Sequence, residues 1–141
     1  MVKRGSTKDW NRQKWQKSAL VDFQKMVRMT AADSEGYCVC CTCGVRRHYK
    51  TMDAGHFISR KHNATAFDSM NCHPQCKKCN LYLDGNQIAY YQYMEQSHGR
   101  TMINRLIQQS KTPRIYTIDE LREMRAEFRR MWKRAQETKN L

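Results

Sequence analysis

The sequence lacks any long apolar run. No stretch approaches the roughly 18 consecutive apolar residues that a membrane-spanning helix needs. The first residues, Met1 to Ser6, lead into a polar and charged stretch without the apolar segment of a secretory signal. We therefore expect no membrane association and a cytoplasmic location.

Acidic residues are also scarce. Asp and Glu number 13 against 26 Lys and Arg, which gives a formal net charge of +13. Such a field attracts polyanions, of which nucleic acid is the commonest in cells. The seven cysteines are an odd number in a chain without an export signal, which argues against a disulfide framework and favours metal binding. Charge and cysteines together favour a zinc-containing protein that binds nucleic acid.

No repeat, low-complexity stretch or long linker divides the 141 residues, so we expect one domain over residues 1–141. Its expected segments are a basic helix over 8–30, a metal-bound core over 37–85, helices over 86–110 and a basic amphipathic helix over 117–138. Gly99 is expected to end the first of the helices after the core. Thr117 and Glu120 form a capping-box pattern at the start of the last one. The expected fold is α+β and mainly helical, a metal-bound centre clasped by the N- and C-terminal helices.

Two CxxC pairs predict a structural zinc site. The expected ligands are Cys40, Cys43, Cys76 and Cys79. Each pair offers two sulfurs from one tight turn, and zinc joins turns that are distant in sequence. Cys38 and Cys41 also have CxxC spacing, but Gly44 supplies the flexible residue that often follows a knuckle turn. Cys38, Cys41 and Cys72 are then expected to be buried apolar residues or spare thiols.

The interval between the two pairs carries groups suited to phosphodiester hydrolysis. This reaction needs a base for water, a divalent ion on the scissile phosphate and a group that orients the base. His56 is a candidate base, because a reference pKa of about 6.5 leaves histidine mostly neutral at pH 7. Asp53 is a candidate metal ligand, although it could be only a turn or capping residue.

Three segments resemble the NinG (Rap) family of phage recombination endonucleases. They are Gly-Tyr-Cys-Val-Cys-Cys-Thr-Cys-Gly, Asp-Ala-Gly-His-Phe-Ile-Ser-Arg and Asn-Cys-His-Pro-Gln-Cys-Lys-Lys-Cys-Asn, at 36–44, 53–60 and 71–80. More broadly, the chain is similar to the HNH, or ββα-metal, nuclease superfamily. The branch with zinc knuckles, which includes phage endonuclease VII, has Asn after the last knuckle cysteine. The resemblance covers nearly the whole chain and implies a ββα-metal core and the cytoplasm of a bacterial host.

The resemblance also implies roles by position. His56 would be the general base, Asn71 would orient it and brace the loop, and Asn80 would be the last ligand of the catalytic metal ion. The residue before the base is commonly His or Asp in these nucleases, but here it is Gly55. Asp53 lies on the same face of an expected strand as Gly55, so we assign it the missing ligand role.

Three further predictions concern His73, the catalytic ion and the oligomeric state. His73 is a further catalytic candidate, as a ligand or a phosphate contact, and could equally support the zinc site. The catalytic ion would be Mg²⁺ or Mn²⁺, in addition to the structural Zn²⁺. An apolar stripe of a terminal helix could form a homodimer interface.

Basic residues near the expected site and in the N-terminal helix are the DNA-binding candidates. They are Arg60, Lys61, Lys77, Lys78, Arg12, Lys14 and Lys17. Their contacts would be mainly with phosphates, which gives affinity with weak sequence preference. The charge of the C-terminal helix could instead be a solvated face.

The expected function is therefore a structure-selective, divalent-metal-dependent DNA endonuclease. As the resemblance implies, it would hydrolyse phosphodiester bonds in branched recombination intermediates such as Holliday junctions and D-loops. One alternative is a non-catalytic zinc module that binds nucleic acid, which would have no need of the candidate catalytic residues. Another is an HNH nuclease that acts in restriction or DNA packaging.

Overall fold

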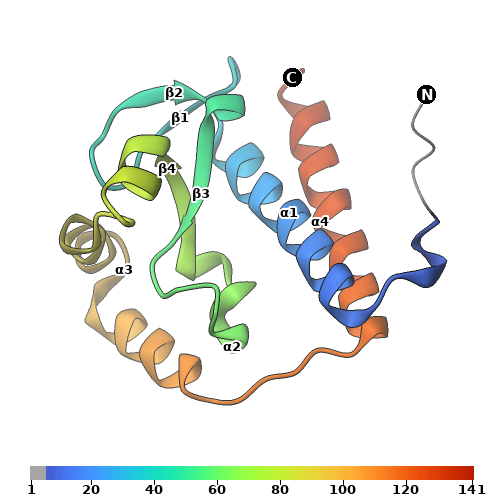
Figure 1. The fold of residues 1–141 in the computed structure, drawn as a ribbon. Helices are drawn as coiled ribbons and strands as arrows, with labels where there is room; N and C mark the ends of the chain where they lie inside the picture. Colours follow the sequence, from blue (N-terminus) through green and yellow to red (C-terminus); the bar gives the residue numbers. More distant parts are fainter. Residues whose placement is uncertain (1–5) are drawn as a thin grey trace.

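The computed structural model describes residues 6–141 as four α-helices and two small sheets (Figure 1). The α-helices are α1 (Arg12–Ala31), α2 (Asn63–Ala66), α3 (Gln87–Ser110) and α4 (Ile118–Thr138). The strands are β1 (Tyr37–Val39), β2 (Arg46–His48), β3 (Met52–His56) and β4 (Cys72–Cys76). The expectation of a mainly helical α+β fold is confirmed. Residues 1–5 lie outside the described part. They belong to the N-terminal stretch on which the expectation of no export signal rests.

The terminal helices α1 and α4 pack side by side, on one side of the molecule (Figure 1). They run in parallel, because successive contacts advance along both: Trp15 clusters with Leu121, and Phe23 packs on Phe128. Asn11 caps the start of α1 by accepting a hydrogen bond from the backbone of Lys14. The capping box expected at the start of α4 is present. The two helices therefore form one layer that covers the centre.

A buried carboxylate joins the two helices. Asp22 of α1 is 8% exposed and accepts a hydrogen bond of 3.0 Å from the indole nitrogen of Trp132. Arg125 and Arg129 of α4 lie 3.4 and 3.6 Å from the same carboxylate. The basic residues of α4 therefore form a solvated face only in part, because Arg125 and Arg129 balance the charge of the buried Asp22.

The centre contains an antiparallel pair of strands, β3 and β4, in which Met52 pairs with Cys76 and His56 with Cys72. One face of the pair packs on α1, where Ala54 and Cys72 join the cluster around Phe23. On the other face, the Tyr90 hydroxyl of α3 donates a hydrogen bond of 2.6 Å to the Gly55 carbonyl. The β3–β4 pair is thus held between α1 and α3.

The remaining elements connect this centre to the flanking helices. A π-helical turn (Lys78–Tyr82) follows β4, and residues with positive φ, from Asp84 to Asn86, lead into α3. Gly99, at φ +82°, breaks the helical geometry of α3, so the expected helix end is a kink between two helical halves. Within residues 6–141 no helix is long and apolar enough to cross a membrane.

Candidate metal centre and active site

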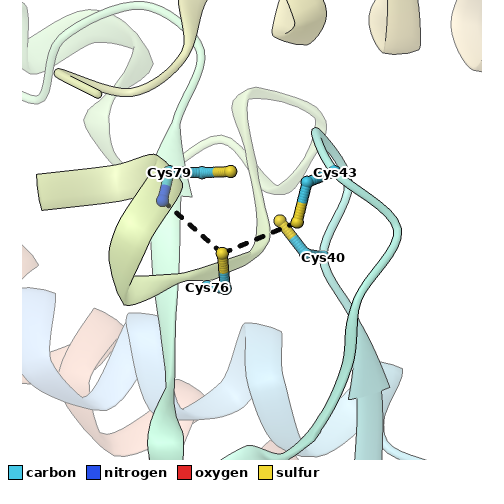
Figure 2. A group of neighbouring side chains, drawn as sticks. All are labelled: Cys40, Cys43, Cys76 and Cys79. Carbon is cyan, nitrogen blue, oxygen red and sulfur yellow. Dashed lines mark hydrogen bonds between the residues drawn. The ribbon is translucent and has the colours of Figure 1, made fainter. Parts of the chain in front are cut away.

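The four cysteines of the two expected pairs converge on one point (Figure 2). Cys40 and Cys43 come from the loop between β1 and β2, Cys76 ends β4, and Cys79 lies in the π-helical turn. Their sulfur atoms all lie within 4.8 Å of one another, and those of Cys43 and Cys76 are 3.7 Å apart. Zinc–sulfur bonds of about 2.3 Å in a tetrahedron place the sulfurs roughly 3.8 Å apart. The cluster therefore fits a structural zinc ion.

Local backbone geometry favours these cysteines over the alternative pair. Gly44 has a positive φ of +79° and donates a hydrogen bond of 2.9 Å to the Cys40 carbonyl, as a tight knuckle turn requires. Burial raises the pKa of Cys40, but hydrogen bonds from the Cys76 backbone and from Thr42 outweigh it and lower the pKa to about 6. Burial raises the pKa of Cys43 to about 12 and also raises that of Cys76, so the proximity of the four sulfurs, and not their pKa values, distinguishes the cluster.

The other three cysteines lie outside the cluster. Burial raises the pKa of Cys41 to about 12, and burial raises the pKa of Cys72 further. The buried Cys38 thiol donates to the Arg28 carbonyl at 3.3 Å, and burial raises its pKa as well. All three stay neutral thiols at pH 7, as expected for residues that only fill the core.

An open pocket of about 530 Å³ lies beside the cysteine cluster. Among its lining residues are Asp53, His56 and Asn80, which the sequence placed in three catalytic roles. Asn80 directly follows Cys79, so its position is tied to the cysteine cluster. Arg60, a candidate phosphate contact, lines the same pocket. The structure therefore brings a carboxylate, an imidazole, an amide and a guanidinium together.

Asp53 and Asn80 are in direct contact. The Asn80 amide nitrogen donates a hydrogen bond of 3.0 Å to one carboxylate oxygen of Asp53, and the Lys77 ammonium lies 2.8 Å from the other. Asp53 lies inside β3 and contacts these side chains, so it is not a turn or capping residue. Its carboxylate and the amide oxygen of Asn80 are hard oxygen donors of the kind that Mg²⁺ and Mn²⁺ take.

His56 is held in one orientation. Its Nε2 atom lies 2.8 Å from the Ala66 carbonyl oxygen, which can only accept, so Nε2 carries the proton. Its Nδ1 atom keeps a lone pair and lies 3.8 Å from the Cys72 sulfur. Burial lowers the pKa of His56, the hydrogen bond to Ala66 offsets part of this shift, and the charge of Arg60 lowers the pKa as well. The imidazole is therefore neutral at pH 7, with Nδ1 as the basic atom.

Asn71 is buried and fastens the loop that follows His56. Its side-chain oxygen accepts from the Ile58 backbone at 2.8 Å, and its amide donates to the Ile58 and Thr65 carbonyls at 2.9 and 3.2 Å. Thr65 precedes Ala66, the residue that orients His56. This geometry is consistent with the bracing role that the resemblance implies.

His73 is not among the residues that line the pocket. Its Nδ1 atom lies 3.2 Å from the Tyr90 hydroxyl, and its Nε2 atom lies 3.2 Å from His98 Nε2. Burial lowers the pKa of His73 to about 4, and His98 lowers it as well. The structure therefore places His73 in a contact between β4 and α3 and does not bring it to the other candidate residues.

The packing around position 55 leaves room only for a glycine. A Cβ atom there would lie 2.0 Å from the side-chain oxygen of Gln75, which is fully buried. Gln75 is itself fixed by a hydrogen bond of 2.7 Å to the Gly85 carbonyl. No metal-binding side chain fits at this position.

Arg28 is a pocket residue that the sequence reasoning missed. It extends from α1 and lines the pocket together with Gln24, one helical turn earlier. Burial lowers its pKa, and Asp53 provides the largest opposing charge. The only sequence signal is the spacing of Gln24 and Arg28 on one helix face, and it becomes informative once α1 is known to cover β3.

The basic candidates fall into two groups. Arg12, Lys17 and Lys61 line a groove that shares Arg60 with the pocket. Lys77 and Lys78 line a second cavity, next to Cys43 and Cys76. Lys14 stands apart and lies 5.5 Å from the ring centre of Trp10.

The fold and the four-cysteine cluster define a small, helix-rich protein with a centre that can hold a structural zinc ion. A family model described as bacteriophage lambda NinG protein matches residues 2–138. The chain therefore belongs to the NinG family. No curated protein and no solved structure matches it.

Proposed function

We propose that this protein is a divalent-metal-dependent DNA endonuclease of the HNH type. The observation that carries the proposal is the meeting of Asp53, His56 and Asn80 in one open pocket beside the cysteine cluster. The order of β3, β4 and the helical turn Lys78–Tyr82 supports a ββα-metal centre. The sequence resemblance supports the same assignment.

Each pocket residue has a part in hydrolysis. His56 Nδ1 takes a proton from the attacking water, while the Ala66 carbonyl holds the ring. Asp53 and Asn80 would hold Mg²⁺ or Mn²⁺, which when bound polarises the scissile phosphate and stabilises the leaving 3′ oxygen. The guanidinium groups of Arg28 and Arg60 bind phosphate oxygens.

The substrate is branched DNA, as in recombination intermediates. The basic residues of the adjoining groove, and Lys77, which contacts Asp53 of the pocket, support binding of the phosphate backbone near the pocket. The resemblance to phage recombination endonucleases supports Holliday junctions and D-loops as substrates, in the cytoplasm of the host. Cleavage of both strands at a junction would be served by a homodimer.

The test is cleavage of a synthetic four-way junction and of a duplex with the same sequence, in Mg²⁺, Mn²⁺ or EDTA. We expect metal-dependent cleavage of the junction, and its loss in His56→Ala with unchanged zinc content and circular dichroism. Cleavage in EDTA, or undiminished cleavage by His56→Ala, would contradict the proposed chemistry.

A non-catalytic nucleic-acid-binding module is the second candidate. It is favoured by the ion pair of Lys77 with Asp53, which neutralises the carboxylate without a metal ion. Folded, zinc-loaded protein that binds the junction but cuts no DNA with either metal would support this candidate. Cleavage of duplex as fast as of junction would favour an HNH nuclease of restriction or packaging.

A further inference from the structure

The segment from Leu81 to Tyr91 exposes an unusual number of large apolar side chains. Leu81 is 58% exposed, Tyr82 82% and Ile88 80%. Eleven large hydrophobic residues are exposed in the described part, and five of them lie in this segment: Leu81, Tyr82, Leu83, Ile88 and Tyr91. Exposed apolar side chains that gather in one place mark an interaction surface.

The segment is fixed to the centre of the molecule. Gly85 donates a backbone hydrogen bond of 2.9 Å to the carbonyl of Cys79, a member of the cysteine cluster. The buried Gln75 amide donates to the Gly85 carbonyl at 2.7 Å. The segment runs from the end of the π-helical turn through the connection to α3 and into the first residues of that helix (Figure 1). Leu81, Tyr82 and Leu83 therefore lie next to backbone that these hydrogen bonds hold in place.

The same segment borders the candidate active site. Leu81 lines the pocket together with His56 and Asn80. Tyr82, the next residue, ends the π-helical turn that carries Asn80. A molecule that places a phosphate next to His56 would therefore bring its neighbouring groups to Leu81, and Tyr82 follows Leu81 directly in the chain.

The surrounding charge identifies the occupant. Lys77 and Lys78 precede the segment and are exposed, and Arg60 lines the pocket with Leu81, whereas the segment itself contains one exposed acid, Asp84. A second copy of the chain would bring its own net charge of +13 to this basic surface. A nucleic acid combines negative charge with flat apolar bases. In a regular duplex these base faces are stacked on each other, so only an unpaired base offers its face to a protein side chain.

We propose that Tyr82, supported by Leu81, stacks on an unpaired base next to the branch point of the bound DNA. This inference rests on the proposed function and adds the residue that distinguishes branched DNA from duplex. Single phosphates are chemically alike in both substrates, whereas a base whose face opens for stacking is found at a branch point or distortion and not within a regular duplex. Stacking on aromatic side chains tolerates any base, which suits selection by structure and not by sequence.

The test compares the full chain with Tyr82→Ala, Tyr82→Phe and Ile115→Ala. Ile115 is a matched control, because it is 70% exposed and lies in the connection between α3 and α4. Affinities for a four-way junction and a duplex are measured by fluorescence anisotropy without added divalent ion. Loss of one stacked base predicts that Tyr82→Ala lowers the ratio of junction to duplex affinity about 5- to 100-fold. Tyr82→Phe and Ile115→Ala are expected to keep the ratio.

A second readout reports the contact itself. A 2-aminopurine base at the branch point should lose fluorescence on binding of the wild-type protein and keep it with Tyr82→Ala. An unchanged affinity ratio in Tyr82→Ala would overturn the inference. If Tyr82→Ala also converts a dimer into a monomer in sedimentation, the segment is instead an interface between copies of the chain.

Cleavage in Mg²⁺ separates this inference from the proposed function. If the wild-type protein prefers the junction in a Tyr82-dependent way but cuts nothing, the stacking stands and the proposed chemistry fails. If it cuts the junction and Tyr82→Ala retains full preference, the chemistry stands and the stacking fails. Equal binding of junction and duplex by the wild-type protein would contradict the stacking directly.

Discussion

The cysteine cluster and the adjacent pocket are neighbours that are built in opposite ways. The cluster takes its four sulfurs from two local pairs, and Cys40, Cys76 and Cys79 are buried. Four thiolates complete the coordination of zinc and leave no position for a substrate. The pocket is open and takes its groups from α1, β3, the following loop and the π-helical turn.

The difference shows how the molecule separates stability from chemistry. Cys79 fixes the next residue, Asn80, and Cys76 pairs with Met52 at the start of the strand that carries Asp53 and His56. The cluster therefore positions pocket residues without taking part in the proposed reaction. Damage to the cluster should cost the fold, whereas damage to the pocket should cost activity and leave the fold.

The largest expected effect is the loss of a zinc ligand. Structural zinc contributes about 10–16 kcal/mol in small zinc-binding peptides, so Cys76→Ser should abolish zinc binding and the cooperative unfolding transition. Cys41→Ser is the matched control, because its sulfur lies outside the cluster and it should retain zinc. Zinc content by mass spectrometry and thermal unfolding by circular dichroism measure both. A folded, cooperatively unfolding Cys76→Ser protein would show that the cluster does not hold the fold together.

A smaller effect is expected from the candidate ligand in the pocket. Asp53→Asn removes a negative oxygen donor for the divalent ion, and we expect junction cleavage to fall about 100-fold or more while zinc content stays unchanged. Asp84→Asn is its control, since this exposed carboxylate lines the same pocket without contacting Asn80. Single-turnover cleavage rates measure the difference. Equal losses in the two variants would mean that only the charge of the pocket matters.

Local patterns made the cysteine cluster predictable. The prediction used only the spacing within each CxxC pair and the position of Gly44, which are local features of the sequence. The structure confirms that the four sulfurs lie together and that Gly44 has a positive φ. The capping box at Thr117 is equally local and was also confirmed. The catalytic roles of His56 and Asp53 came from the resemblance and from strand alternation, and they stay predictions.

The features that the sequence did not predict depend on tertiary packing. Arg28 enters the pocket because α1 lies over β3, and Asp22 draws arginines of α4 inward over more than 100 residues of sequence. No local signal reports such pairings. His73 shows the same limit: strand alternation gives its face, but not that Tyr90 and His98 of α3 would occupy that side.

The smallest expected effect is the response of the cleavage rate to pH. His56 acts as a base only when it is neutral, and burial lowers its pKa below the ordinary value of about 6.5. The rate of junction cleavage should therefore stay level from pH 8 down to about 6.5 and fall only below it, approaching tenfold per pH unit.

The same lowered pKa makes the folded protein bind fewer protons than the unfolded chain, so stability also declines as the pH falls below about 6.5. His73, with its pKa lowered to about 4, contributes in the same direction. Rates and zinc content measured on the same samples between pH 5 and 8 separate the two regions. A fall in rate that follows loss of zinc would assign the pH dependence to the cysteine cluster, whereas a fall at full zinc occupancy would assign it to His56.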